Sequence, residues 1–271
     1  MNIPGIIEKW DGVLYLAMNL VSSIMYFTKY RKHHRLLSRN RKFKNKHERQ
    51  RCFVVLNGPS INNYELTHLK HEIVFATNYF FRAPICKEVE PDYYCWLDAK
   101  SFLKDSANEL LGELRTVCPQ AECFLNAKAY KKLGNQKRVN YVYAKHIPNI
   151  YGIKSNLSGV MSNFSTVAFL AINTAIYMGF KEIYVLGLDF EPGGFTHFTD
   201  LKSTPLKPIN KSKKREVADI HWSYAKAHYE SYVLADYARK KGIRIINLNP
   251  KSNIRAFEFG SFEELFADNT K

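Results

Sequence analysis

The sequence predicts an α/β fold in which helices cover both faces of a mostly parallel sheet. Three observations indicate this fold. Short apolar runs alternate with longer helical patterns after residue 51, the runs are apolar throughout, and 46% of the 271 residues are hydrophobic. Strands that are buried on both faces have continuous apolar sequences, and their alternation with helices is typical of parallel sheets. A chain of this length can bury a full core.

The apolar runs and helical patterns place the individual elements. Strands are expected at 52–56 (CFVVL), 72–77, 93–97, 122–125, 141–143, 182–188 (EIYVLGL) and 243–248 (IRIINL). Helices are expected at 106–114, 163–178 and 220–240. Residues 193–215 contain Gly, Pro, Ser and Lys without periodicity, which predicts a long surface loop of the kind that often closes over an active site.

The positive charge of the chain is concentrated near its start. Lys and Arg number 40 against 25 Asp and Glu, a net charge of +15, and residues 29–51 hold a large share of it. The cations of that run are Lys29, Arg31, Lys32, Arg35, Arg39, Arg41, Lys42, Lys44, Lys46, Arg49 and Arg51. We therefore expect two regions: residues 1–50 as a membrane-interface helix with a basic linker, and residues 51–271 as the α/β domain.

The segment before the basic run has an apolar stripe at helical spacing. Apolar residues including Trp10, Leu14 and Ile24 recur on one side between residues 3 and 27, and polar residues fall on the other. A Trp-bearing stripe followed by Lys and Arg is typical of a helix in a membrane interface. We expect a peripheral or monotopic anchor on an anionic cytoplasmic leaflet. A spanning helix, a helix packed on the protein itself, and nucleic-acid binding are the alternatives.

The five cysteines do not form a metal-binding pattern. Cys118 and Cys123 are the one close pair, with no second pair or nearby His, so zinc is not expected. We expect reduced, mostly buried thiols, as in a cytosolic protein.

Polar residues follow three of the predicted strands. Ligands of open α/β sheets bind beyond the carboxyl ends of the strands. The candidate ligand-binding residues at these ends are Asn57, Gly58, Pro59, Ser60, Asn78, Gly187 and Asp189. A glycine allows close approach of a ligand to the backbone, and a helix start favours phosphate. The same residues are also common in turns. A P-loop Lys and the three glycines of a dinucleotide fingerprint are missing after the first strand.

Histidines supply candidate acid–base groups. His221 and His228 are two turns apart on the last predicted helix and share a face with Tyr224, while His197 lies in the predicted lid. A neutral imidazole can take a proton from a hydroxyl near neutral pH. For any one of these histidines, a surface or core position is the alternative.

Several motifs resemble those of a known group of enzymes. They are FVVLNGPS (53–60), ATNYFF (76–81), AIYMGFKEIYVLGLDF (175–190) and IRIINLNPKS (243–252). Over residues 51–252 the chain resembles bacterial sialyltransferases of glycosyltransferase family 42 and the related MptE-like (DUF115) proteins. The resemblance implies that residues 51–271 form a catalytic glycosyltransferase domain with a Rossmann-like, GT-A-like fold. It also implies inverting, metal-independent transfer of sialic acid from a CMP-sugar to a glycan hydroxyl, in assembly of lipopolysaccharide, O-antigen or capsule.

The resemblance also implies roles for individual residues. Asn57, Gly58, Pro59, Ser60, Asn78, Ser162, Ser165, Gly187, Asp189, His197 and Tyr224 would bind the donor. His221 would be the general base, with His228 as second choice. No cofactor is expected. The acceptor would be a lipid-linked glycan at the cytoplasmic face of the bacterial inner membrane, and an oligomer is possible.

The sequence departs from the family pattern at two positions, where Glu191 and His197 replace tyrosines that help to neutralise the departing phosphate. A different CMP-sugar such as Kdo is therefore an alternative donor. A pterin pyrophosphokinase that uses ATP and Mg²⁺, with Asp98 and Asp189 as metal ligands, and a non-catalytic membrane-bound scaffold are further alternatives.

Overall fold

The structure is a computed structural model. It describes residues 34–148, 153–190 and 217–267, together with part of the segment before them. The described residues of that segment are Val13, Leu14, Leu16, Ala17, Met18, Leu20, Val21, Ile24 and Thr28. The predicted lid, 193–215, lies outside the described residues. Among those that are described, no helix has the length and hydrophobicity needed to cross a bilayer.

The described chain forms one sheet of nine strands in the order β6-β5-β4-β3-β2-β1-β7-β8-β9. All neighbouring strands are parallel. The strands are β1 (Arg51–Val55), β2 (Val74–Thr77), β3 (Tyr93–Trp96), β4 (Glu122–Asn126), β5 (Val139–Pro148), β6 (Val160–Asn163), β7 (Glu182–Leu186), β8 (Arg244–Asn247) and β9 (Glu258–Phe259). The predicted α/β fold with a parallel sheet is confirmed.

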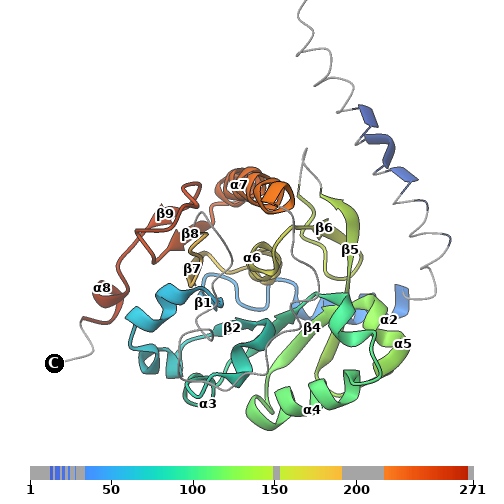
Figure 1. The fold of residues 1–271 in the computed structure, drawn as a ribbon, viewed down its shortest axis with the longest axis horizontal. Coiled ribbons are helices and arrows are strands. Elements are labelled where there is room, and N and C mark those ends of the chain that lie inside the picture. The colour runs from blue at the N-terminus through green and yellow to red at the C-terminus, as the bar shows by residue number, and fades with distance from the viewer. Residues whose placement is uncertain are drawn as a thin grey trace, which may run out of the picture.

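Helices cover both faces of the sheet. Helices α6 and α7 lie on one face, and α3 and α4 on the other (Figure 1). The α-helices with described bounds are α2 (His34–Ser38), α3 (Cys86–Val89), α4 (Ala107–Val117), α5 (Tyr130–Leu133), α6 (Val167–Met178), α7 (Val217–Lys240) and α8 (Phe262–Phe266). Short 3₁₀ helices include η2 (Arg39–Phe43), which follows α2, and η3 (Pro59–Asn63) and η5 (Asn78–Arg82), which follow β1 and β2.

The two faces of the sheet have separate hydrophobic cores. In β1, Phe53 and Val55 belong to the core on one face, while Cys52 and Val54 belong to the core on the other. This alternation is the period of two expected for a strand. Helix α6 is apolar around almost its whole circumference and nearly all of it is buried, as expected for a helix enclosed between a sheet and a second helix.

Residues 34–50 are part of the folded domain, which differs from the predicted linker. The side chains of Leu37, Asn40 and Phe43 are fully or almost fully buried. Asn40 Nδ2 donates to the carbonyls of Tyr141 and Leu157, each at 2.8 Å. The linker prediction was wrong for residues 34–50. The few buried side chains that determine how this segment packs are not evident among its many cations in the sequence.

The thiols are as the sequence predicts. All five cysteines are free and buried. Cys86, the first residue of α3, and Cys118, which directly follows α4, have their Sγ atoms 3.4 Å apart in the core on one face of the sheet. Within the described residues, no group of three or more His, Cys, Asp or Glu side chains is placed to hold a metal ion.

Candidate functional site

The carboxyl ends of β1 and β7 form the switch point of the sheet. The chain builds β2 to β6 on one side of β1 and then places β7 on its other side. Crevices at such points are where ligands of open α/β sheets bind. The two predicted segments, 57–60 and 187–189, meet there: the Gly58 amide donates to the Gly187 carbonyl at 3.1 Å. The structure thus brings these two predicted segments together.

Both glycines at this contact are required by the close approach of the two loops. A Cβ on Gly58 would lie 2.3 Å from the Gly187 carbonyl oxygen and 2.5 Å from Asp189 Oδ2. Gly187 has φ +72°, a left-handed conformation that side chains rarely adopt. Any larger residue at position 58 would therefore push the two loops apart.

The Asp189 carboxylate holds three loops together. Its Oδ2 accepts from the Ser60 amide at 2.8 Å, and its Oδ1 accepts from the Ser60 hydroxyl and from Asn249 Nδ2, the latter at 2.7 Å. Asp189 is 6% exposed. Its two oxygens thus connect the segments that follow β1, β7 and β8. Asn249 was not singled out in the sequence, although its place directly after a strand, like that of Asp189, is the signal that could have identified it.

The backbone beyond Asp189 is held by a second asparagine. Asn253 donates its amide to the Asp189 carbonyl at 3.0 Å and its Nδ2 to the Phe190 carbonyl at 2.7 Å. Phe190 has φ +52°, which is uncommon for a bulky residue. Residues in such conformations persist where their surroundings hold them, and they are common at functional sites.

Asn57 and Asn78 follow the adjacent strands β1 and β2. Asn57 Nδ2 donates to the Thr77 carbonyl at 3.1 Å and to its hydroxyl at 3.3 Å. Asn57 Oδ1 is buried and has no hydrogen-bond partner among the described residues. Asn78 has φ +48°, and its carbonyl accepts from the Tyr94 hydroxyl at 2.6 Å. Buried polar atoms without a partner are uncommon, which singles out Asn57 among the residues at this strand end.

The two predicted serines are engaged within the protein. Ser162 lies in β6 and is buried, and its hydroxyl accepts from the Lys154 amide at 2.9 Å. Ser165 donates its amide at 2.8 Å and its hydroxyl at 2.5 Å to Glu230 Oε2. Glu230, on α7, is 6% exposed, and its Oε1 has no described partner. Burial raises the pKa of this carboxyl, and the two bonds from Ser165 oppose the rise. Glu230 was missed because an acidic residue in an otherwise polar helix looks like a solvent-exposed one.

Helix α7 brings one of the two predicted histidines to the end of β7. The rings of His228 and Phe190 are edge-to-face with centroids 6.2 Å apart, and those of Tyr224 and Phe190 are 5.5 Å apart. His221 is exposed and lies nearer the start of the helix. His228 and Tyr224 therefore border the switch point. His197 lies outside the described residues.

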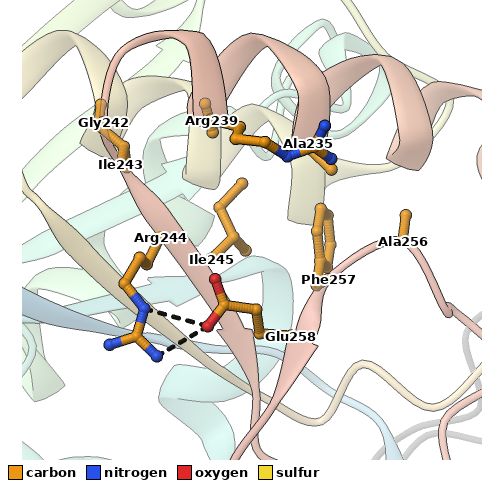
Figure 2. Close-up of a pocket in the computed structure, with 10 residues that line it drawn as sticks. Ala235, Arg239, Gly242, Ile243, Arg244, Ile245, Ala256, Phe257 and Glu258 are labelled. Carbon is orange, nitrogen blue, oxygen red and sulfur yellow. Dashed lines mark hydrogen bonds and ion pairs between the residues drawn. The ribbon is translucent and has the colours of Figure 1, made fainter.

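A pocket of about 270 Å³ lies at the opposite edge of the sheet, where β8 and β9 begin. It is formed by the end of α7, the start of β8 and residues 256–258. Figure 2 shows Arg244 and Glu258 paired at its rim, with their N–O distance at 2.7 Å. None of the predicted site residues lines this pocket.

Comparison with known families identifies the chain. The sequence model of one family, described as 6-hydroxymethylpterin diphosphokinase MptE-like, matches residues 21–193. The chain belongs to the MptE-like family. The predicted resemblance to MptE-like proteins is thus confirmed. No curated protein matches this MptE-like chain.

Three solved structures are similar to the MptE-like chain at low identity. The sialyltransferase CstII from Campylobacter jejuni, in complex with the substrate analogue CMP-3FNeuAc, has 14% identity and TM-score 0.42, with 77% of this chain and 84% of that chain covered. The sialyltransferase CST-II with trisaccharide acceptor and CMP has 15% identity and TM-score 0.43, with 78% and 85% covered. The monofunctional α-2,3-sialyltransferase Cst-I from Campylobacter jejuni has 18% identity and TM-score 0.40, with 78% and 79% covered. Likeness at this level does not bear on function.

Proposed function

We propose that this chain is an inverting, metal-independent glycosyltransferase. It transfers a sialic acid, or a related nonulosonic acid, from a CMP-sugar to a glycan hydroxyl in assembly of lipopolysaccharide, O-antigen or capsule. The observation that carries the proposal is the set of uncharged residues where β1, β2 and β7 end: Asn57 with its unpartnered oxygen, Asn78 directly after β2, and the close-packed glycines. The motif resemblance assigns CMP to the same place.

In this proposal, the nucleotide occupies the switch point and α7 supplies the base. Asn57 and Asn78 bind CMP, and Gly58 and Pro59 keep the loop close to the β7 end. His228 takes the proton of the acceptor hydroxyl as its oxygen bonds to the anomeric carbon, and the bond to the CMP oxygen breaks with its electron pair passing to the phosphate. The contact of His228 with Phe190 favours it over His221, which is exposed. Tyr224 and His197 would stabilise charge on the departing phosphate.

A thermal-shift panel tests the proposal. CMP, CDP, UDP, GDP and ATP are each added with and without Mg²⁺. At a hundredfold excess over Kd, a ligand stabilises the folded state by about 2.7 kcal/mol, which corresponds to roughly 5–10 °C in Tm for a chain of this size. We expect such a shift with CMP, unchanged by Mg²⁺ and much reduced in Asn57→Ala. No shift with CMP, or one that survives Asn57→Ala, would overturn the assignment.

A second candidate function is favoured by the family description. A pterin diphosphokinase would bind ATP with Mg²⁺, and Asp98 and Asp189 are its predicted ligands. The hydrogen bonds of Asp189 are evidence against a role in binding Mg²⁺, because both of its oxygens already accept from Ser60 or Asn249. Stabilisation by ATP that requires Mg²⁺ would support the diphosphokinase. Transfer of another CMP-sugar such as Kdo would give the same CMP shift, and competition between CMP-sugars would identify the donor. A non-catalytic scaffold would bind none of the nucleotides.

The N-terminal segment gives the proposed enzyme its place on a membrane. The side chains of Leu16 and Leu20, both in helical conformation, are 71% and 62% exposed. We propose that residues 1–50 attach the protein to the anionic cytoplasmic face of the inner membrane, where a lipid-linked glycan is the acceptor. Exposed aliphatic side chains next to a basic run are the composition of an interfacial anchor.

A further inference from the structure

Cations gather at the amino edge of the sheet, the edge at which the parallel strands begin. Arg51 and Arg244 are the first residues of β1 and β8. Lys181 immediately precedes β7, and its amide donates to the Gln50 carbonyl at 3.0 Å. Helices α6 and α7, which cover one face of the sheet, also end at this edge. The other described cations at this edge are Arg39, Arg41, Lys42, Lys44, Lys46, Arg49, Lys137, Arg138, Arg239, Lys240 and Lys241.

Residues 39–50 are held along this edge by specific contacts. Lys46 Nζ donates to the hydroxyl of Tyr93, the first residue of β3, at 2.9 Å. The Asn45 and His47 amides donate to carbonyls in the last turn of α6 at 3.2 and 2.9 Å. Phe43 packs on Tyr93, with ring centroids 6.3 Å apart. The basic segment is therefore fixed on the domain, and its cations are displayed on one surface.

Some of these cations are neutralised and others are not. Arg244 pairs with Glu182 at 2.9 Å and Lys42 with Glu122 at 3.5 Å. Arg41, Lys44 and Arg49 are exposed and form no ion pair with any described residue. A surface of this kind attracts polyanions.

We propose that the amino edge of the sheet is a second membrane-contact surface, which docks the folded domain on an anionic phospholipid bilayer with the carboxyl edge facing away. The inference rests on the proposed membrane attachment, and it goes beyond that attachment because it assigns contact to the domain itself. An anionic bilayer is favoured over nucleic acid because the same chain displays exposed aliphatic side chains just before the basic segment, including Leu16, Leu20 and Ile24. Those side chains suit a lipid surface and have no use on a nucleic acid.

Vesicle binding by the full chain tests this orientation. The test variant replaces Lys137, Lys181 and Lys241 with Gln. These exposed cations of the amino edge lie outside residues 1–50 and form no ion pair with any described residue. The control variant replaces Lys104, Lys128 and Lys251, three exposed cations that follow β3, β4 and β8 at the carboxyl edge, and has the same net charge. A cation near an anionic leaflet contributes about fivefold to binding, so three contribute roughly a hundredfold.

Binding is measured by co-sedimentation with vesicles of phosphatidylglycerol and phosphatidylcholine, and with phosphatidylcholine alone. We expect the test variant to lose roughly a hundredfold in affinity for the anionic vesicles, and the control variant to lose clearly less. Equal losses in the two variants would overturn the inference while leaving membrane attachment intact. No binding of the unmodified chain to either vesicle would overturn the attachment as well. Tighter binding to a single-stranded oligonucleotide than to the anionic vesicles would replace the bilayer with nucleic acid.

Hydrogen exchange on the vesicle-bound full chain gives an independent reading. We expect slower exchange in peptides that cover 41–50 and 240–244, and unchanged exchange in those that cover 98–105 and 127–131. Slower exchange at the second pair instead would place the carboxyl edge on the membrane and refute the proposed orientation. Because neither measurement depends on nucleotide, their failure is distinguishable from failure of the transferase assignment.

Discussion

Replacing Asp189 with Asn tests how the candidate site is held together. Three donors point at the carboxylate: the Ser60 amide at Oδ2, and the Ser60 hydroxyl and Asn249 Nδ2 at Oδ1. An Asn side chain has one acceptor oxygen, so its NH₂ group must face at least one of these donors. The best arrangement leaves the Ser60 amide unsatisfied, which costs about 1–3 kcal/mol, and weakens the remaining bonds because the acceptor is no longer charged.

We expect Asp189→Asn to destabilise the protein by about 3 kcal/mol. For a chain of this size, that lowers Tm by roughly 6–12 °C. Thermal unfolding measured by circular dichroism checks the value. Asp105→Asn is the matched control, since this exposed carboxylate pairs with Lys132 at 2.6 Å on the surface. If Asp189→Asn and Asp105→Asn melt within a degree of each other, the three-loop connection proposed for Asp189 does not exist in solution.

Three further predictions follow from the described contacts. Burial raises the pKa of the Glu230 carboxyl in the folded protein. Protonation of Glu230 therefore stabilises the fold below the unfolded-state pKa of about 4.3. This stabilisation is lost as pH rises through the folded-state pKa. Glu230→Gln should therefore match or exceed the unmodified protein in Tm at pH 7.5 and lose that advantage near pH 4; a lower Tm at pH 7.5 would contradict this. Deletion of residues 1–33 should weaken membrane binding and leave the protein folded. Deletion of 1–50 should also lower Tm or prevent folding, because it removes buried side chains that cost about 3–5 kcal/mol each; equal Tm values for the two truncations would be inconsistent with the observed packing. On a soluble acceptor, His228→Ala should lower turnover by at least about a hundredfold and His221→Ala by much less, and the reverse order would move the base to His221.

The sequence predicts the central strands well and the edges poorly. The predicted runs at 52–56, 93–97 and 182–188 correspond to β1, β3 and β7 within a few residues. Central strands of a parallel sheet are buried on both faces, so their sequences are continuously apolar. The edge strands β6 and β9 were not predicted, because VMSN and EF contain polar residues and are short. The helix predicted to begin at 163 begins at Val167, after Thr166 caps it.

The position of the candidate site was predictable, and its internal bonding was not. The rule that ligands bind beyond strand ends selects the residues after β1, β2 and β7 from the sequence alone. That rule does not distinguish a residue that faces a ligand from one that holds the loops. Asp189 and Ser165 are engaged by Asn249 and Glu230, which come from elements remote in the sequence. Such pairings depend on how α7 and β8 return to the sheet, which no local pattern encodes.

Because all neighbouring strands of the sheet are parallel, the length of the strands sets the distance between its amino edge and its carboxyl edge. At about 3.3 Å per residue, the five residues of β1 separate the two edges by roughly 17 Å. With the amino edge resting on lipid, the reaction centre would stand at least that far above the headgroups. An acceptor tethered to the bilayer would have to be several sugars long before its terminal hydroxyl reached that level. The length of the strands would thus select long acceptor glycans and exclude short ones.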